Sequence, residues 1–544
     1  MAANIADLVE HAVDLVPERV AIICGDRRVT YAELEQRANR LAHHLAEQGV
    51  GPGAHVGFQC RNSVEALETI VAAYKLRSVP VNINYRWVEN ELHYLYDNAD
   101  LVALVHDRAF TDRVRAVLPR VPKLRHVIVL DDGEGPEVPE GHGVDYEQAL
   151  DGSRPERDFD ERSGDDIYIL YTGGTTGHPK GVMYRHHDVW CALGGGIDFF
   201  TGEPLADEWV QSRTGKDSAL VRMSLAPLIH GAAQWAALQA LFTCATYVQM
   251  PRFDPHAVWR AVDQHKVNML TLVGDAMGRP LIEAYHEGDY DGSSLFSISS
   301  QAALFSPSVQ RQFLDAFPNA VLTDAVGSSE GGFNGIQMIT KDGAYTGGPR
   351  ITIGPDVIVI DEDGRPVAPG SGVIGKIGRT GPVPIGYYKD PEKTAALFVE
   401  VDGKRYVVPG DFARVEDDGT VTLLGRANTS INTGGEKVFP EEVEGALKSH
   451  PDVFDALVIG VPDERFGQRV AAVIAPRPGA VPDPAALDAH VRGLIAGYKV
   501  PRTLWLVDEI GRLPSGKPDY RWAQRHVAEH DPVPEAGTAA PVEA

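Results

Sequence analysis

The sequence predicts an α/β protein with a large N-terminal domain of stacked sheets, a small β-barrel-like subdomain, and a small α+β C-terminal domain. Strands and helices alternate along the first part of the chain. Short strands broken by Gly, Pro and Asp-Gly turns follow from about residue 335, and a helix–strand–strand–helix pattern comes last. Alternation predicts largely parallel sheets covered by helices, and 544 residues exceed what one hydrophobic core organises.

Local signals predict the first elements. The segment "RVAIICGD" is typical of a strand and a turn, and Thr30 and Glu33 then have the spacing of a helix capping box. The helix that follows has one apolar face, formed by Leu34, Ala38, Leu41 and Leu45. The segments "HVGFQC", "SVEALETIVAAYKL" and "VPVNIN" repeat the strand–helix–strand unit. The pattern continues through "DDIYIL", a predicted buried strand.

The second half of the chain sets the expected domain boundaries. Segments such as "GKRYVVPGDFARVEDDGTVTLLGR" predict the small antiparallel subdomain from about residue 335. We expect an N-terminal domain over residues 1–427 and a C-terminal domain over 428–530. Residues 531–544 are rich in Pro, Ala and Glu and lack periodicity, so we expect a disordered tail.

The overall charge excludes some partners. Acidic residues outnumber basic ones 76 to 51, which gives a formal net charge of −25. This balance argues against binding to nucleic acid or to an anionic membrane surface. Any anionic ligand must therefore be bound by local cations and backbone N–H groups.

Cysteine usage and hydropathy bear on the compartment. The four cysteines are far apart and form no C-x-x-C pair, which fits a reducing cytoplasm. The N-terminus has no basic region typical of a secretory signal, and no run of 18 apolar residues occurs. We expect a cytoplasmic protein without a membrane span. The sequence leaves the oligomeric state open, with a homodimer as one option.

A glycine-rich loop over Tyr171–Gly181, "YTGGTTGHPKG", follows the strand "DDIYIL". Glycines let backbone N–H groups approach a ligand closely, threonines add donors and a lysine adds charge, which suits a phosphate cradle. It is not a P-loop of the usual spacing, because His178 and Pro179 separate Gly177 from Lys180. The alternative is a flexible surface loop. The candidate phosphate-binding residues are Thr172, Gly173, Gly174, Thr175, Thr176, Gly177 and Lys180.

This loop resembles the phosphate-loop signature of the adenylate-forming superfamily, which includes acyl-CoA synthetases, firefly luciferase and peptide-synthetase adenylation domains. The resemblance continues in order over nearly the whole chain, as far as "LPSGKPDYR". It implies the adenylate-forming enzyme fold, in which the small C-terminal domain is mobile.

The stretch "DAVGSSEGGF" resembles the family's aromatic-Gly-x-Thr-Glu motif. The resemblance implies that Glu330 binds Mg²⁺, a hard cation that favours carboxylate oxygen. It also implies nucleotide contacts from Val326, Gly327, Ser328 and Ser329. Ser329 stands in place of threonine and keeps the hydroxyl, whereas Val326 stands in place of an aromatic ring. Without the resemblance, Ser-Ser-Glu is more typical of a helix N-cap.

Two further stretches resemble the adenine and acyl sites. "ISSQAALFSPS" corresponds to the adenine strand and implies contacts from Ser300, Gln301 and Ala302, although Gln301 and Ala303 depart from the usual Gly-Gly-Ala-Pro. "APLIHGAAQW" implies that His230 is the gate beside the acyl pocket. The alternative for this histidine is a structural role.

The resemblance assigns the ribose to Asp411 in "VVPGDF", because a carboxylate accepts hydrogen bonds from two hydroxyls. Arg426 would lie next to the ribose and phosphates. Asn428 stands at the hinge position, where the family usually has Asp or Lys. The alternatives are a capped turn for Asp411 and a surface ion pair for Arg426.

The predicted C-terminal domain carries the remaining candidates. Gly434, Gly435 and Glu436 correspond to the face that binds coenzyme A, and Lys499 in "AGYKVPR" is assigned to the same side. Lys517 corresponds to the lysine that contacts the acyl carboxylate and the α-phosphate during adenylation. An exposed lysine after glycine is otherwise usually only solvated.

The implied activity has two steps, with ATP, Mg²⁺, coenzyme A and a small carboxylic acid as reactants and cofactors. A carboxylate attacks the α-phosphorus of ATP to give an acyl-adenylate and pyrophosphate, and the coenzyme A thiolate then displaces AMP. Lys517, Glu330 and His230 would be the catalytic residues. The domain rotation implied by the family exchanges the donors of the two steps.

The acid is less defined by the sequence. "GAAQWAALQALF" is rich in alanine, which leaves room for a bulky apolar acid or simply packs a helix. The stretches "VGDAMGRPL" and "INTGGEKVFPEEVE" resemble actinobacterial synthetases that activate steroid side-chain acids and related lipids. Medium- or long-chain fatty acids are the second candidate substrates, and aryl acids are the third. The competing classes are a ligase that passes the acyl group to an amine or carrier-protein thiol, and a non-catalytic acyl- or AMP-binding regulator.

Overall fold

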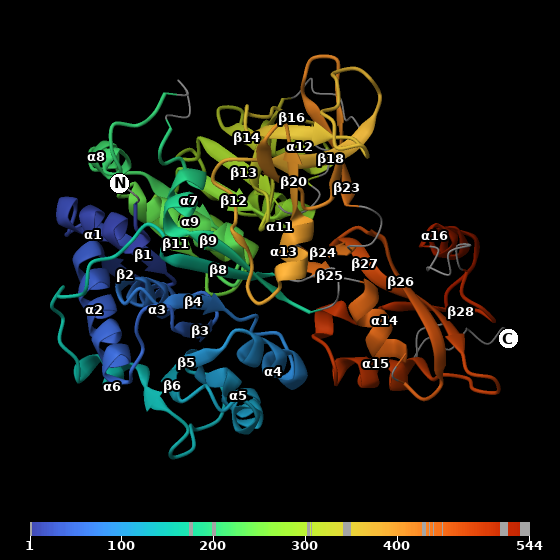
Figure 1. Ribbon diagram of the computed structural model, residues 1–544, viewed down its shortest axis with the longest axis horizontal. Coiled ribbons are helices and arrows are strands. Elements are labelled where there is room, and N and C mark those ends of the chain that lie inside the picture. Colours follow the sequence, from blue (N-terminus) through green and yellow to red (C-terminus); the bar gives the residue numbers. More distant parts are fainter. Residues whose placement is uncertain are drawn as a thin grey trace. The chain divides into compact units, whose positions relative to one another are not determined.

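The computed structural model (Figure 1) describes residues 3–172, 178–197, 203–301, 305, 307–340, 350–426, 431–434, 436–438, 440–448, 450–511 and 520–533. The chain divides into two compact units, which are taken separately below. The first comprises Met1–Tyr85, Leu95–Thr172 and Lys180–Gly425, and the second comprises Arg86–Tyr94, Gly173–Pro179 and Arg426–Ala544. Most of the expected disordered tail, residues 534–544, lies outside the described residues.

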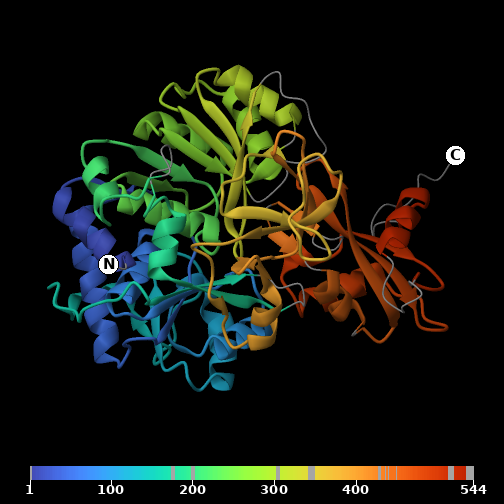
Figure 2. The same ribbon diagram turned by 45° about the horizontal axis from the view of Figure 1, so that its top comes forward.

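The largest sheet of the first unit has eight strands in the order β15-β14-β13-β12-β10-β11-β1-β2. The strands from β14 to β1 pair in parallel, and β15 and β2 pair antiparallel at the two edges. The bounds are β1 (Val20–Cys24), β2 (Arg27–Thr30), β10 (Val221–Ser224), β11 (Thr246–Gln249), β12 (Met269–Leu272), β13 (Ser297–Gln301), β14 (Val321–Ser328) and β15 (Gly332–Ile339). The view in Figure 2 shows this sheet with helices beside it.

Helices connect the parallel strands of the eight-stranded sheet. They are α9 (Gly231–Phe242), α10 (Pro255–His265), α11 (Gly274–Glu287) and α12 (Pro307–Ala316), with the shorter α7 (His186–Ala192) and α8 (Val210–Gly215) before β10. Helices α10, α11 and α12 supply apolar side chains to one core with Met223, Leu270 and Ile298 of the sheet. The predicted strand–helix alternation is therefore confirmed.

A second sheet of the first unit is parallel throughout, in the order β4-β3-β5-β6-β7. Its strands are β3 (His55–Gln59), β4 (Val79–Asn82), β5 (Leu101–Asp107), β6 (His126–Leu130) and β7 (Val144–Asp145). The helices in this part of the sequence are α1 (Ile5–Leu15), α2 (Tyr31–Glu47), α3 (Val64–Lys75), α4 (Glu89–Asn98), α5 (Thr111–Val117) and α6 (Tyr146–Asp151), with two 3₁₀ turns at Arg108–Phe110 and Leu118–Arg120.

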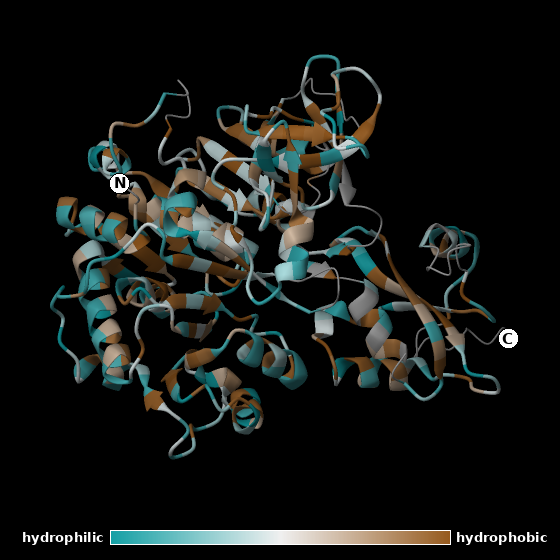
Figure 3. Ribbon diagram, viewed as in Figure 1, coloured by the Kyte–Doolittle hydropathy of each residue, from teal (hydrophilic) through white to brown (hydrophobic). Residues whose placement is uncertain are grey.

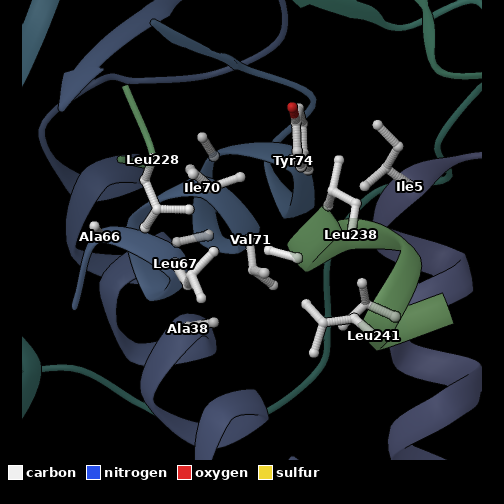
Figure 4. Packing of buried hydrophobic residues seen from close by; sticks show 14 of the residues in the cluster. Ile5, Ala38, Ala66, Leu67, Ile70, Val71, Tyr74, Leu228, Leu238 and Leu241 are labelled. Atoms are coloured by element: carbon white, nitrogen blue, oxygen red, sulfur yellow. The ribbon is translucent and has the colours of Figure 1, made fainter. Parts of the chain in front are cut away.

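Helix α3 is buried on all sides because it packs between other helices. Figure 4 shows Leu67 and Val71 of α3 among Ala38 of α2 and Leu238 and Leu241 of α9. The charged residues that α3 buries are paired, Glu68 with Arg37 and Lys75 with two glutamates. This core joins the N-terminal helices to α9.

The capping box predicted for α2 is present. The Thr30 hydroxyl accepts a hydrogen bond from the Glu33 N–H at 3.2 Å, and the Glu33 carboxylate accepts one from the Thr30 N–H at 2.7 Å. The four predicted apolar positions are all fully buried, namely Leu34, Ala38, Leu41 and Leu45. Both predictions for this helix are confirmed.

Two antiparallel sheets complete the first unit. One has the order β19-β9-β8, with β8 (Ile167–Thr172), β9 (Lys180–Arg185) and β19 (Gly386–Tyr387). The other has seven strands, namely β16 (Arg350–Ile351), β17 (Val357–Ile360), β18 (Ile374–Arg379), β20 (Phe398–Val401), β21 (Lys404–Val407), β22 (Asp411–Val415) and β23 (Val421–Arg426). Helix α13 (Pro391–Leu397) precedes β20.

The second unit contains a sheet in the order β25-β24-β27-β26, with β28 beside β27. Its elements are β24 (Ile431–Thr433), β25 (Glu436–Val438), α14 (Pro440–Lys448), β26 (Val453–Asp463), β27 (Gly467–Pro476), α15 (Pro484–Arg492), a 3₁₀ turn (Gly497–Lys499), β28 (Thr503–Leu506) and α16 (Tyr520–Glu529). The predicted helix–strand–strand–helix pattern is confirmed.

Both faces of β26 and β27 are buried, which explains their near-continuous apolar sequence. Val458 and Ala472 face a core with α14 and α15, whereas Leu457 and Val473 face a second core that includes Ala523 of α16. Apolar residues, brown in Figure 3, follow these strands. In the part of the chain that the structure describes, no helix combines the length and apolar character needed to cross a bilayer.

A buried carboxyl in the five-stranded sheet makes stability depend on pH. Asp107, at the end of β5, accepts a hydrogen bond from the Arg61 N–H at 2.9 Å. Burial raises the pKa of the Asp107 carboxyl to about 7, although this N–H opposes the shift. The unfolded chain releases the proton near pH 4, so the folded state holds an extra proton between these values. The contribution of Asp107 to folding stability therefore falls as the pH rises from about 4 to 7.

We expect Asp107→Asn to stabilise the protein more at pH 8 than at pH 4.5. The amide keeps an acceptor for Arg61 but has no proton to lose. The folded and unfolded pKa of Asp107 differ by about three, which corresponds to at most about 4 kcal/mol of unfolding free energy. Thermal melting at the two pH values checks this, with Asp131→Asn as an exposed control. An equal change in melting temperature at both pH values would contradict the assignment.

Candidate active site

The glycine-rich loop joins two paired strands. Thr172 ends β8 and lies directly opposite Lys180, which begins β9. The two ends of the loop are therefore held side by side, as the cradle prediction requires. The predicted loop residues Gly173, Gly174, Thr175, Thr176 and Gly177 lie outside the described residues.

Asn82, at the end of β4, fixes the backbone around this loop. Its Nδ2 donates to the carbonyl of Tyr171 at 2.8 Å and to that of Ile229 at 2.7 Å, and its Oδ1 accepts from the Tyr171 N–H at 2.8 Å. Asn82 is buried. One amide thereby holds the start of the loop beside the segment that carries His230. Sequence reasoning missed this residue, whose only signal is a polar side chain inside the largely apolar segment "VPVNIN".

Glu330 lies in a tight turn between β14 and β15, and its side chain is buried. The Tyr387 hydroxyl donates to Glu330 Oε1 at 3.1 Å, and the Ser328 hydroxyl accepts from the Gly331 N–H at 2.8 Å. Gly332 has a φ of +62°, which a glycine adopts without strain. No helix begins in this described segment, so the N-cap alternative for Ser-Ser-Glu is wrong.

Tyr184 of β9 holds the same turn through a hydrogen bond. Its buried hydroxyl donates to the carbonyl of Ser329 at 2.8 Å. Burial, with the nearby Glu330 charge, raises the pKa of this hydroxyl far above its ordinary value, so the group remains a donor. The Tyr184 side chain, from the three-stranded sheet, therefore fixes the position of the backbone at Ser329, next to Glu330.

Lys180 and Glu330 both contact one tyrosine. The Lys180 ammonium lies 5.1 Å from the centroid of the Tyr387 ring, while the hydroxyl of the same ring bonds Glu330. Tyr387 comes from β19, whose neighbour in the three-stranded sheet is β9. The arrangement brings together a cation at the end of a glycine loop and a buried carboxylate, the groups that a magnesium–phosphate ligand needs.

The carboxyl ends of β13 and β14 lie together. Ser300 and Gln301 pair with Asp324 and Ala325 in parallel register, so the predicted adenine strand adjoins the strand that leads to Glu330. Ser300 is fully buried, and its hydroxyl accepts a hydrogen bond from the Gly274 N–H at 3.2 Å. Gln301 is half-buried. Ala302 lies outside the described residues, and Val326 and Gly327 are in β14.

Three further candidates lie at element ends. His230 is the N-cap residue of α9 and is half-buried. Asp411 begins β22 after Gly410, whose φ is +99°. Arg426 is the last residue of β23; it belongs to the second unit. Asn428, the predicted hinge residue, lies outside the described residues.

Besides Arg426, the second unit carries three described candidates. Gly434 forms a turn with a φ of +60° between β24 and β25. The buried Glu436 accepts a hydrogen bond from Arg86 Nη1 at 2.6 Å. Lys499 is also buried and donates to Glu91 at 2.7 Å. Gly435 and Lys517 lie outside the described residues.

The described residues contain no group of three or more His, Cys, Asp or Glu side chains arranged to hold a metal ion. Glu330 is a carboxylate that contacts the same tyrosine as Lys180.

Comparison with known proteins identifies the class. The model of the AMP-binding enzyme family matches residues 9–388, and that of the AMP-binding enzyme C-terminal domain matches residues 442–517. The chain belongs to the AMP-binding enzyme family. It is an AMP-forming acid–thiol ligase that uses ATP, Mg²⁺ and coenzyme A.

The chain is similar to particular ligases over its whole length. It is 57% identical over 531 residues to the 3-oxocholest-4-en-26-oate–CoA ligase of Rhodococcus rhodochrous, with 96% of each chain covered. It is 54% identical over 541 residues to the medium/long-chain-fatty-acid–CoA/3-oxocholest-4-en-26-oate–CoA ligase of Mycolicibacterium smegmatis, with 98% of each covered. Among solved structures, the amide bond synthetase McbA of Marinactinospora thermotolerans is 26% identical with a TM-score of 0.78, and 96% of this chain and 99% of McbA are covered.

Proposed function

We propose that this enzyme converts a large hydrophobic acid, first a steroid side-chain acid and second a medium- or long-chain fatty acid, into its coenzyme A thioester. The observation that carries the substrate class is the 57% identity, over nearly the full length, with a ligase named for 3-oxocholest-4-en-26-oate. The alanine-rich α9 beside His230 supports a spacious apolar acyl site.

We assign the first step, adenylation, to Glu330 and to the loop that ends at Lys180. The substrate carboxylate attacks the α-phosphorus of ATP, a P–O bond to the acyl group forms, and the bond to pyrophosphate breaks. Glu330 would hold Mg²⁺, which supplies positive charge to the phosphates. The loop that ends at Lys180 would bind the leaving phosphates through N–H groups, hydroxyls and the ammonium. Catalysis then consists of positioning and charge stabilisation.

The second step needs different donors. The coenzyme A thiolate attacks the acyl carbonyl, a C–S bond forms and AMP leaves with the electron pair of the broken C–O bond. We assign Gly434, Gly435 and Glu436 to this step, and Asp411 to the ribose hydroxyls in both steps. Residues 1–427 and 428–530 would be the two domains, with Asn428 as the hinge. We place the enzyme in the cytoplasm, and a homodimer is the oligomeric state to test.

Tyr387 is proposed as a positioning residue for Glu330. We expect Tyr387→Phe to raise the Mg²⁺ concentration needed for half-maximal adenylation about three- to tenfold, because the carboxylate loses one neutral hydrogen bond while the ring below Lys180 remains. Magnesium titration of pyrophosphate release checks this, and the shift of melting temperature by Mg·ATP gives a second readout. Tyr388→Phe is the matched control. An unchanged magnesium requirement would contradict the role.

The likeness to McbA favours one second candidate, an enzyme that passes the acyl group from the adenylate to an amine. A panel of steroid, fatty and aryl acids with ATP, with and without coenzyme A, separates the two. We expect acid-dependent pyrophosphate release and acyl-CoA with the steroid acids and long-chain fatty acids. Pyrophosphate release without any thioester would favour amide formation. No release with any acid would reject both and favour a non-catalytic binding protein.

A further inference from the structure

One face of α9, a mostly apolar helix, is accessible. Ala232, Trp235, Ala236 and Gln239 are half-buried, whereas the residues between them are buried. Their spacing places them on one side of the helix. The accessible face begins next to His230 and extends about 12 Å, at 1.5 Å per residue, to Gln239. An apolar helix face that stays accessible within a domain is suited to contact a ligand.

An arginine without an acidic partner lies at the far end of this face. Arg222 of β10 is half-buried, and its Nη1 donates to Gln239 Oε1 at 2.9 Å. Its Nε is buried and has no hydrogen-bond partner. In the ranges that the structure describes, no carboxylate lies within 4.0 Å of this guanidinium. Burial lowers the pKa of Arg222, as expected for a charge without a counter-ion.

This environment differs from that of Arg37 and Arg77 in the same unit. Arg37 donates to Glu68 at 2.6 Å and to Glu147 at 2.7 Å, and Arg77 donates to Asp166 at 2.9 Å. Buried guanidinium groups are ordinarily paired in this way, because the desolvation cost is high. Arg222 is kept without that compensation, which points to a partner supplied from outside the chain.

The sheet directs Arg222 toward the helix. Arg222 lies opposite Met269 of β12, and Met269 lies opposite Ser297 of β13, so the three share one row. Their neighbours in sequence, Met223 and Leu270, lie in the core on the other face with α10, α11 and α12. Ser297 is half-buried like Arg222, and the hydrogen bond to Gln239 shows that the Arg222 side chain extends toward α9.

The Gln239 amide is held so that its oxygen faces the guanidinium. Its Nε2 donates to the carbonyl of Leu193 at 3.2 Å, which leaves Oε1 as the acceptor from Arg222. The guanidinium is thereby fixed through Nη1, and it retains donors for a further acceptor. Fixing of this kind lowers the entropic cost of binding a ligand.

We infer that Arg222, held by Gln239, hydrogen-bonds an oxygen at the end of the acyl group farthest from the carboxylate. The enzyme would thereby select acids with a distal carbonyl or hydroxyl over the same acids without one. The inference rests on the proposed function, and it deepens it. The acid in the names of the Rhodococcus and Mycolicibacterium ligases carries such an oxygen, a 3-oxo group at the opposite end from its 26-carboxylate.

The test compares 3-oxocholest-4-en-26-oate with cholest-4-en-26-oate, which lacks the ketone, and with octadecanoate. We expect the wild-type kcat/KM to favour the 3-oxo acid over its ketone-free partner by about ten- to a hundredfold, the usual effect of a hydrogen bond from a charged donor. Arg222→Met should reduce this ratio to near one. Its kcat/KM for octadecanoate should stay within about threefold of the wild-type value.

Melting curves separate recognition from packing. Arg222→Met without ligand should melt at the wild-type temperature or above, because an apolar side chain replaces an uncompensated buried charge. The 3-oxo acid should raise the melting temperature of the wild type more than that of the variant. Arg260→Met, an exposed arginine on α10, is the matched control and should change neither ratio nor melting temperature.

The possible failures are distinct. If the wild type activates both steroid acids equally, the role of Arg222 is wrong and the proposed steroid function stands. If Arg222→Met loses activity equally on all three acids, the arginine is structural and the inference is overturned. If the wild type activates octadecanoate but neither steroid acid, the proposed substrate class itself fails, and the inference fails with it.

Discussion

Replacing Lys517 with alanine is expected to slow acyl-adenylate formation by about 10²–10³-fold, the usual effect of removing one donor that stabilises transition-state charge. Thioester formation from supplied acyl-adenylate should remain within about threefold of the wild-type rate, because the lysine is assigned to the first step alone. Acid-dependent pyrophosphate release measures the first step, and acyl-CoA formed from acyl-adenylate and coenzyme A measures the second.

The comparison of the two half-reactions is what makes this prediction specific. A variant that merely folds poorly loses both rates together, and such a result would remove Lys517 from the assigned role. Lys404→Ala, at an exposed position of β21, provides the control. Lys517→Arg should recover part of the first rate, since it restores the charge with a different geometry.

Glu330→Gln is expected to lower the adenylation rate by about 10²-fold and to raise the magnesium requirement more than Tyr387→Phe does. The amide keeps the volume of the side chain and an oxygen acceptor for Tyr387, but it removes the charge that a hard cation needs. Pyrophosphate release over a magnesium titration measures the effect. Mg·ATP should also raise the melting temperature of the variant less than that of the wild type.

Exposed Glu392→Gln on α13 is the matched control for this change, and it should behave as the wild type. Normal magnesium dependence in Glu330→Gln would show that the cation is bound elsewhere. A loss of melting temperature without ligand would instead indicate that the buried carboxylate holds the turn between β14 and β15.

Local signals explain why much of the fold was predictable. The capping box at Thr30 and the apolar face of α2 depend on residues within two turns of one another, and both are confirmed. The alternation of strands and helices likewise identified the parallel sheets. The glycine loop and Glu330 could be singled out because their motifs are contiguous in the sequence.

Contacts between distant segments could not be predicted in this way. Tyr387 forms a hydrogen bond with Glu330, which is 57 positions away in the sequence, and Asn82 forms hydrogen bonds with Tyr171, which is 89 positions away. Neither residue lies in a motif that the sequence singled out for chemistry, and both are placed by sheet pairing. The role of Arg222 likewise depends on which face of β10 adjoins α9. Lys517, Asn428 and the central loop residues stay predictions.

The Asn82 bridge has a consequence for how acid selectivity changes among such enzymes. Both acceptors of its amide group are main-chain carbonyls, at Tyr171 and Ile229, so the link does not depend on the side chains at those positions. Substitutions along α9 can therefore reshape the proposed acyl site while the start of the glycine-rich loop keeps its anchor. An exchange of α9 side chains between relatives should alter which acid is used and leave the affinity for ATP nearly constant.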